Sequence, residues 1–202
     1  AFNQEKPLQA MQQSYSGVLP CADCGGLETS LFLQQDGTYI LQEVYQDTKD
    51  GNQTFASYGN WARTADKLVL TDAKGEKRYF HPKDENLEML DTSGAPIVSS
   101  LNYTLKPTQQ SLPKTPMTLT GMMQYSADAA SFKDCATGKV FPMSANKSLE
   151  EGYLAARQSP NQLVFVSMDG HFMTEPSMEE GQMHKAVVAD KNVKFDVTRA
   201  CL

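Results

Sequence analysis

Short segments with alternating side chains, separated by turn signals, dominate the first half of this 202-residue chain. In residues 27–33, every second position falls on one face of a strand, and three of those positions hold leucine. Asp36-Gly37 follows, which is a strong hairpin signal because glycine tolerates the positive φ of a tight turn. Residues 38–45 then return as the partner strand, so the pattern predicts antiparallel β-structure.

The same pattern continues, with almost no helical periodicity. Further strands are expected at residues 55–63, 67–71, 77–81, 86–90 and 101–106. Many short strands at regular spacing are typical of an antiparallel meander, and a meander of this length protects its edges best by closing into a barrel. Trp61, the one tryptophan, is expected to close the barrel floor or fill its core.

A proline-rich break separates the two halves of the chain. Residues 106–116 hold three prolines and several small polar residues, which is typical of a linker. The predicted organisation is therefore one domain at residues 1–108, a linker at 109–116 and a second domain at 117–202.

The second half is expected to form a small barrel with one helix. Ser148 and Glu151 are spaced as a capping box, so a helix is predicted over residues 147–157. Strands are expected at residues 117–125, 163–168, 170–174, 186–189 and 193–197. Strands around a single helix suit a five-stranded barrel of the OB type, and the predicted fold class is mainly β.

Charge and hydropathy exclude two function classes. The net charge of -6 argues against nucleic-acid binding, which depends on neutralising phosphates with Lys and Arg. No run reaches the roughly 18 apolar residues of a membrane-spanning helix. The chain starts at Ala1, so any export signal or lipid-bearing cysteine is expected upstream of it.

Four cysteines form one close pair, Cys21 and Cys24, and one distant pair, Cys135 and Cys201. An even number in a strand-rich chain favours two disulfides and an oxidising compartment; four reduced thiols in a cytosolic protein are the alternative.

The close pair has three interpretations. A thioredoxin-like role is rejected, because Gly25-Gly26 and a strand follow Cys24 in place of the helix that would lower the thiol pKa. A metal clip stays open, since two thiolates suit soft ions such as Cu(I) or Zn. The third interpretation is a disulfide that shapes a short loop and adds little stability.

The distant pair would behave differently. A bridge between Cys135 and Cys201 would close a loop of roughly 65 residues, worth ~4 kcal/mol by chain entropy. A small barrel can have only ~5 kcal/mol of stability in total. Such a bond is either a plain stabiliser or one whose loss reports on oxidation in its compartment.

Several motifs resemble the NlpE family. They are the GVLPCADC stretch at residues 17–24, FASYGNWARTADKLVLTD at 55–72, DCATGK at 134–139, and SLE with YLAAR at 148–157. NlpE is an outer-membrane lipoprotein of enteric bacteria that is also called a copper homeostasis protein. The resemblance covers nearly the whole chain.

The resemblance implies a lipocalin-like N-terminal barrel and a C-terminal OB-fold. It implies an N-terminal lipid anchor in the outer membrane, facing the periplasm, and signalling to the periplasmic domain of the Cpx sensor kinase. The stimuli would be surface adhesion, lipoprotein-trafficking faults and redox or copper stress. The family's CxxC falls on Cys21 and Cys24, and its redox-sensing pair on Cys135 and Cys201. The family's lipid-bearing cysteine is absent here, so the chain is expected to correspond to a soluble form cut after the anchor.

Alternatives to a stress sensor are a copper-binding protein and a carrier of a small hydrophobic ligand. Copper would bind at Cys21 and Cys24 with methionines. A weaker copper hypothesis uses His171, Met173, Met178, Met183 and His184. The histidines show no nucleophile or metal signature, so no enzyme and no resident cofactor are predicted. The protein is expected to be a monomer or a domain-swapped dimer.

Overall fold

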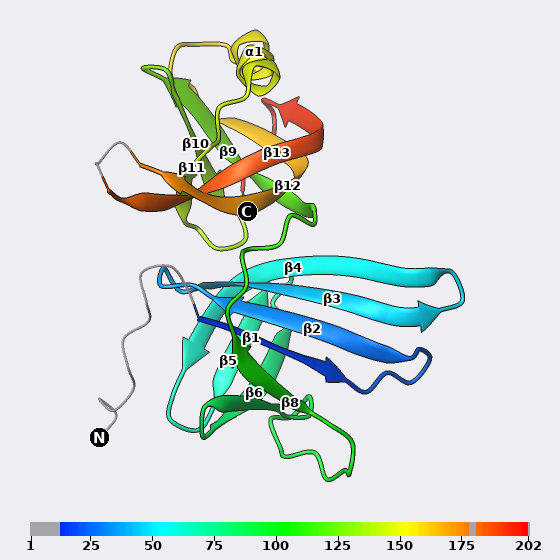
Figure 1. Cartoon of the computed structure of the whole chain (residues 1–202). Coiled ribbons are helices and arrows are strands. Elements are labelled where there is room, and N and C mark those ends of the chain that lie inside the picture. The colour runs from blue at the N-terminus through cyan, green and yellow to red at the C-terminus, as the bar shows by residue number, and fades with distance from the viewer. Residues whose placement is uncertain (1–12, 178–180, 202) are drawn as a thin grey trace. The chain divides into compact units, whose positions relative to one another are not determined.

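The computed structural model describes residues 13–177 and 181–201. It divides into two compact units, Ala1–Ser111 and Leu112–Leu202 (Figure 1). Within the described ranges, no helix combines the length and apolarity needed to cross a bilayer.

The first unit is a closed barrel of eight antiparallel strands. Each strand pairs with the next, and β1 pairs with β8 to complete the circle. The prediction of a mainly β fold with an N-terminal barrel is thereby confirmed. The strands are β1 (Gln13–Leu19), β2 (Gly26–Leu33), β3 (Thr38–Thr48), β4 (Gly51–Arg63), β5 (Leu68–Asp72), β6 (Lys77–Lys83), β7 (Asn86–Met89) and β8 (Thr104–Thr108).

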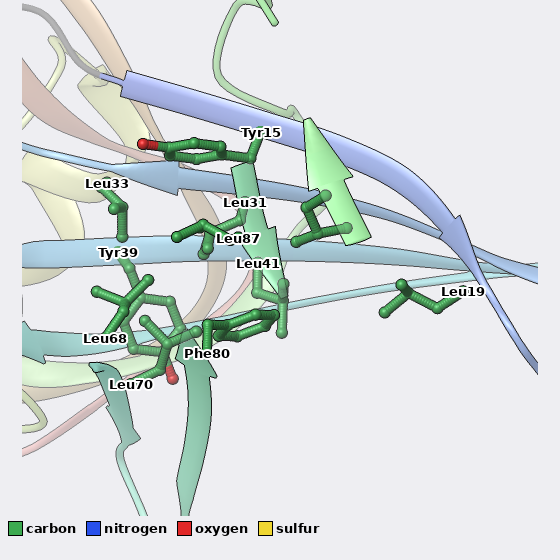
Figure 2. Packing of buried hydrophobic residues seen from close by; sticks show 11 residues of the cluster. Tyr15, Leu19, Leu31, Leu33, Tyr39, Leu41, Leu68, Leu70, Phe80 and Leu87 are labelled. Carbon is green, nitrogen blue, oxygen red and sulfur yellow. The ribbon is translucent and has the colours of Figure 1, made fainter. Parts of the chain in front are cut away.

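The barrel is filled by large side chains from alternate positions of its strands. Tyr15 of β1, Leu31 of β2, Leu41 of β3 and Phe80 of β6 turn toward the same interior (Figure 2). Leu31 and Phe80 have 0% and 1% of their surface exposed. Because the side-chain period of a strand is two, this shared interior fixes the register of every neighbouring pair.

Strand β1 was not predicted from the sequence. Only Tyr15 and Leu19 of this strand are large buried apolar residues, and Gly17 lies between them. A Cβ at Gly17 would lie 2.6 Å from the carbonyl oxygen of Thr104. The glycine therefore permits close packing near the closure of the barrel, and it also removes the apolar signal that would have predicted a strand.

Trp61 closes one end of the barrel. Its indole Nε1–H donates to the carbonyl oxygen of Gln34 over 2.9 Å, and its backbone N–H donates to Gly37 over 2.9 Å. The ring also packs against the buried cluster. These contacts hold the β2–β3 turn across the barrel end, as expected for this residue.

The second unit is a five-stranded sheet with the order β11-β10-β9-β12-β13. A parallel bridge joins Met143, just after β11, to Val187 of β13, so the outer strands meet as an OB-type barrel requires. Its elements are β9 (Met117–Ser126), β10 (Ala129–Asp134), β11 (Val140–Pro142), α1 (Lys147–Ala156), β12 (Val164–Pro176) and β13 (Met183–Asp196).

Four local expectations for this unit were wrong. The strands expected at 163–168 and 170–174 are one strand, β12, and those expected at 186–189 and 193–197 are one strand, β13. The pairing of these two long strands has an irregular register at Asp169, which interrupts the alternation. The short strands β10 and β11 were not predicted. The helix is capped by Asn146 rather than Ser148, because the Asn146 side chain accepts a hydrogen bond from the Leu149 N–H over 3.0 Å.

Replacing Trp61 with phenylalanine tests the barrel closure. The substitution keeps an aromatic ring but leaves the Gln34 carbonyl without its indole donor. We expect the free energy of unfolding to fall by about 1–3 kcal/mol, measured by urea denaturation and circular dichroism. An unchanged urea midpoint would show that the hydrogen bond does not stabilise the closed end.

Candidate functional site

The Cys21–Cys24 disulfide lies in the loop between β1 and β2. The two Cα atoms are 5.3 Å apart, and both cysteines are half-buried. The following Gly25 donates its N–H to the Gln46 carbonyl over 2.7 Å, and a Cβ there would lie 2.5 Å from a carboxylate oxygen of Asp47. A side chain at position 25 would therefore have to displace the exposed Asp47 side chain where the bent loop crosses the end of β3.

This geometry bears on the metal prediction for Cys21 and Cys24. Both sulfurs are committed to the disulfide, and thiolates are the form that binds soft ions. No group of three or more His, Cys, Asp or Glu side chains suited to a metal ion occurs in the part of the chain that the structure describes. A copper site at this pair would therefore require prior reduction.

The Cys135–Cys201 disulfide joins residues that are 66 apart in sequence and 5.2 Å apart between Cα atoms. Cys135 directly follows β10, and its N–H donates to the Thr120 carbonyl of β9 over 2.9 Å. Cys201 lies beyond the end of β13. The bond thus ties the end of the chain to the sheet's central strands.

A buried carboxylate organises the turn that carries Cys135. Asp134 is fully buried, and its Oδ2 accepts from the Thr137 N–H over 2.8 Å and the Thr137 hydroxyl over 2.6 Å. Gly138 takes a positive φ of 74° and donates to the Asp134 carbonyl. The DCATGK motif is therefore explained as a side-chain-stabilised turn that fixes the position of one disulfide partner.

The segment before Cys201 is held at two further points. Asp196 Oδ1 accepts from the Thr198 N–H over 2.9 Å and also from its hydroxyl. Both hydrogen bonds lower the pKa of the Asp196 carboxyl, and the one from the Thr198 hydroxyl has the larger effect. The Arg199 guanidinium lies 4.4 Å from the ring centre of Phe165 on β12. Both contacts direct the chain end toward Cys135.

The histidines of β12 and β13 do not converge on one site. His171 Nδ1 lies 2.8 Å from Asp190 Oδ2, whereas His184 Nε2 lies 3.1 Å from Glu175 Oε1. Glu175 also accepts from the Ser144 hydroxyl over 2.8 Å, so the carboxylate stands between serine and histidine. A catalytic triad needs the histidine in that middle position. Met178, from the weaker copper hypothesis, is outside the described residues.

The open end of the barrel holds a cavity of about 470 Å³ that the sequence analysis did not find. Beside it, Arg78 makes a bidentate ion pair with Glu43, at 3.0 and 3.2 Å. Burial, with added repulsion from Asp72, raises the pKa of the Tyr39 phenol well above its usual range, so the phenol stays neutral. The sequence offered one signal of this polar cavity: the alternation of β3 places Glu43, a charged residue, on the inward face.

The chemistry of this cavity is mixed. Its lining combines apolar groups such as Leu41 and Met89 with charged groups such as Asp72, Glu76 and Lys77. Asp72 is half-buried there, so a purely hydrophobic ligand packed against it would leave its carboxylate poorly solvated. The cavity is better matched to a ligand that brings polar groups together with an apolar side chain.

Comparisons with known proteins agree across both units. The family model described as the NlpE N-terminal domain matches residues 15–100, and the NlpE C-terminal OB domain model matches residues 113–202. A curated relative, Lipoprotein NlpE from Escherichia coli (strain K12), is 53% identical over 198 residues, covering 98% of this chain and 84% of the relative.

Two solved structures are also similar. One is the Cpx pathway activator NlpE from Escherichia coli, with 53% sequence identity, coverage of 95% of this chain and 98% of that chain, and a TM-score of 0.46. The other is a putative lipoprotein from Shewanella oneidensis, with 31% identity, coverage of 51% and 93%, and a TM-score of 0.42.

The two disulfides should differ in their effect on stability. From the length of the closed loops, Cys201→Ser should lower the free energy of unfolding of the second unit by about 4 kcal/mol, and Cys24→Ser that of the barrel by about 2 kcal/mol. Trp61 fluorescence reports on the barrel, and amide NMR signals report on the second unit, during urea denaturation. Equal losses in both units would contradict the loop-length argument.

Thr198→Ala should raise the pKa of Asp196 toward its ordinary value, as measured by NMR titration of the carboxyl carbon. A lowered folded-state pKa means that the carboxylate's contribution to stability is present above the unfolded pKa of about 3.9 and is lost as pH falls through the folded pKa. That acid-side contribution should shrink in the variant. Asp91, whose pKa is lowered by Ser93 in the other unit, is the internal control.

Proposed function

Because the chain belongs to the NlpE family, we propose that it is an envelope lipoprotein that senses stress at the outer membrane and signals to the Cpx sensor kinase. In this proposal a lipid outside the given sequence anchors the N-terminal barrel, which faces the periplasm. The barrel presents the surface that the kinase recognises. The protein acts by binding and carries out no catalytic turnover.

The observation that carries this proposal is the Cys135–Cys201 bond. It closes the long loop between the end of β10 and the end of the chain, and both cysteines are half-buried, within reach of a small thiol. A dithiol reductant that gives up two electrons would convert the bond to two thiols and become a disulfide itself. The loop-closure stabilisation would then be lost.

Loss of the bond is the proposed stress signal. Without it, the segment after Asp196 keeps the short turn at Thr198 and Arg199 and the Arg199–Phe165 contact. Those contacts are local and weak beside a covalent link. The second unit loosens, and signalling to the kinase rises. Redox stress acts directly on this bond, and copper acts as an oxidant that promotes wrong pairing of the four cysteines.

A stress-pathway reporter tests the proposal in cells that carry the anchored protein. Cys135→Ser and Cys201→Ser should each raise the reporter signal, since each removes the same bond, and the double substitution should add nothing further. Cys21→Ser is the matched control, because it breaks a disulfide of the other unit. An unchanged reporter, with the variant still delivered to the outer membrane, would refute the redox part.

A further inference from the structure

Strand β4 has a free edge over more than half of its length. It pairs with β3 from Gly51 to Asn60, but with β5 only from Gly59 to Arg63. Among the described residues, no strand pairs with the other side of residues 51–57. Figure 1 shows the cause: the β3–β4 hairpin extends beyond the point where β5 turns away.

The backbone groups on this edge can be assigned from the alternation of the ladder. Trp61 donates its N–H to Gly37, toward β3. Successive residues of a strand direct their N–H and C=O groups to opposite sides. The groups of Asn52, Thr54 and Ala56 therefore point away from β3, toward the free edge.

This edge lacks the features that normally protect one. Sheet edges are usually blunted by lysine, proline or other charged residues, or by short strands. Residues 51–57 read GNQTFAS, with no charge and no proline. The edge is long, neutral and able to pair.

The inner face beside the edge carries an aromatic pair, Phe55 and Tyr45, and leads to the cavity. Phe55 is 56% exposed and makes an edge-to-face contact with Tyr45, with ring centres 5.6 Å apart. Glu43 stands directly opposite Phe55 in the ladder, but its charge is paired with Arg78. Ser57, two residues along the same face, lines the cavity.

We propose that the free edge of β4 binds an extended peptide segment of a partner protein by strand addition. The segment runs antiparallel to β4 and continues the direction in which β5 ends. Its backbone pairs with Asn52, Thr54 and Ala56, and one inward apolar side chain packs on Phe55 beside the cavity. Backbone bonds supply affinity and the pocket supplies specificity, as in other strand-addition sites. The inference rests on the proposed function, for which it names the docking surface.

Charge argues against a second copy of the chain as the occupant. Each copy carries a net charge of -6, and residues 1–112 hold 14 acidic against 9 basic residues, a net of -5. Two such barrels joined edge to edge would repel each other. The mixed lining of the cavity also suits a peptide, which brings polar backbone groups along with its side chains.

The test uses the full chain and a phage-displayed library of random peptides, so that it does not depend on the kinase. Thr54→Pro removes an outward N–H while leaving the β3–β4 ladder intact, because proline is tolerated where the N–H faces solvent. Thr54→Ala is the matched control that keeps the donor, and Phe55→Ala removes the ring. Selected peptides should bind the wild type and Thr54→Ala equally and bind Thr54→Pro about tenfold more weakly. Phe55→Ala should also weaken binding.

Hydrogen exchange gives a second readout. A bound peptide should slow exchange of the Asn52, Thr54 and Ala56 amides. Failure to select any peptide, equal binding to Thr54→Pro, or protection elsewhere would overturn the inference. So would a dimer in sedimentation experiments that Thr54→Pro abolishes, because a second copy would then occupy the edge.

The periplasmic domain of the kinase separates this inference from the proposed function. If that domain binds the wild type and Thr54→Pro equally, the edge is not the docking surface and the inference fails while the proposed function stands. If peptides bind the edge but the kinase domain does not bind the wild type, the edge inference stands and the proposed partner is wrong.

Discussion

Closure of the barrel by the pairing of β1 with β8 is the constraint on which the first unit depends. Among the described residues, Ser14, Tyr15 and Ser16 take part in that register, opposite residues 106–108, and the Ser14 hydroxyl adds a 2.7 Å hydrogen bond to the Thr108 carbonyl. Without this seam, an eight-stranded meander would carry two open edges. With it, the inward residues of all eight strands enclose one core, and unequal strand lengths leave a long unpaired stretch on β4.

The second unit secures its last residues with a covalent link. Its outer strands meet through the parallel bridge between Met143 and Val187. The Cys135–Cys201 bond joins the turn that Asp134 organises to the segment beyond β13. A segment fastened by one disulfide is more sensitive to reduction than one held by a ladder of hydrogen bonds. This difference is why the redox signal is assigned to the second unit and docking to the first.

The sequence predicted features carried by local patterns and missed those set by tertiary contact. Alternation and the Asp36-Gly37 turn were enough for the meander, and the family motifs suggested both barrels. Strand β1 was missed because Gly17, required by the nearby Thr104 carbonyl, removes the apolar period. The Asn146 cap was missed because Ser148 and Glu151 offered a competing pattern. The Glu43–Arg78 pair joins β3 to β6, and no local rule relates those positions.

The free edge of β4 and the mixed cavity acquire one explanation when they are taken together. A barrel that only needed to be stable would match its strand lengths or place a charge at residues 51–57, as natural sheets usually do. A carrier of hydrophobic ligands would line its mouth with apolar groups, whereas Asp72, Glu76 and Lys77 lie at this one. A peptide meets both conditions, because its backbone completes the ladder and its polar groups face charged side chains. The mouth of the barrel and the adjoining edge of β4 therefore fit a peptide-binding site better than the entrance of a carrier for hydrophobic ligands.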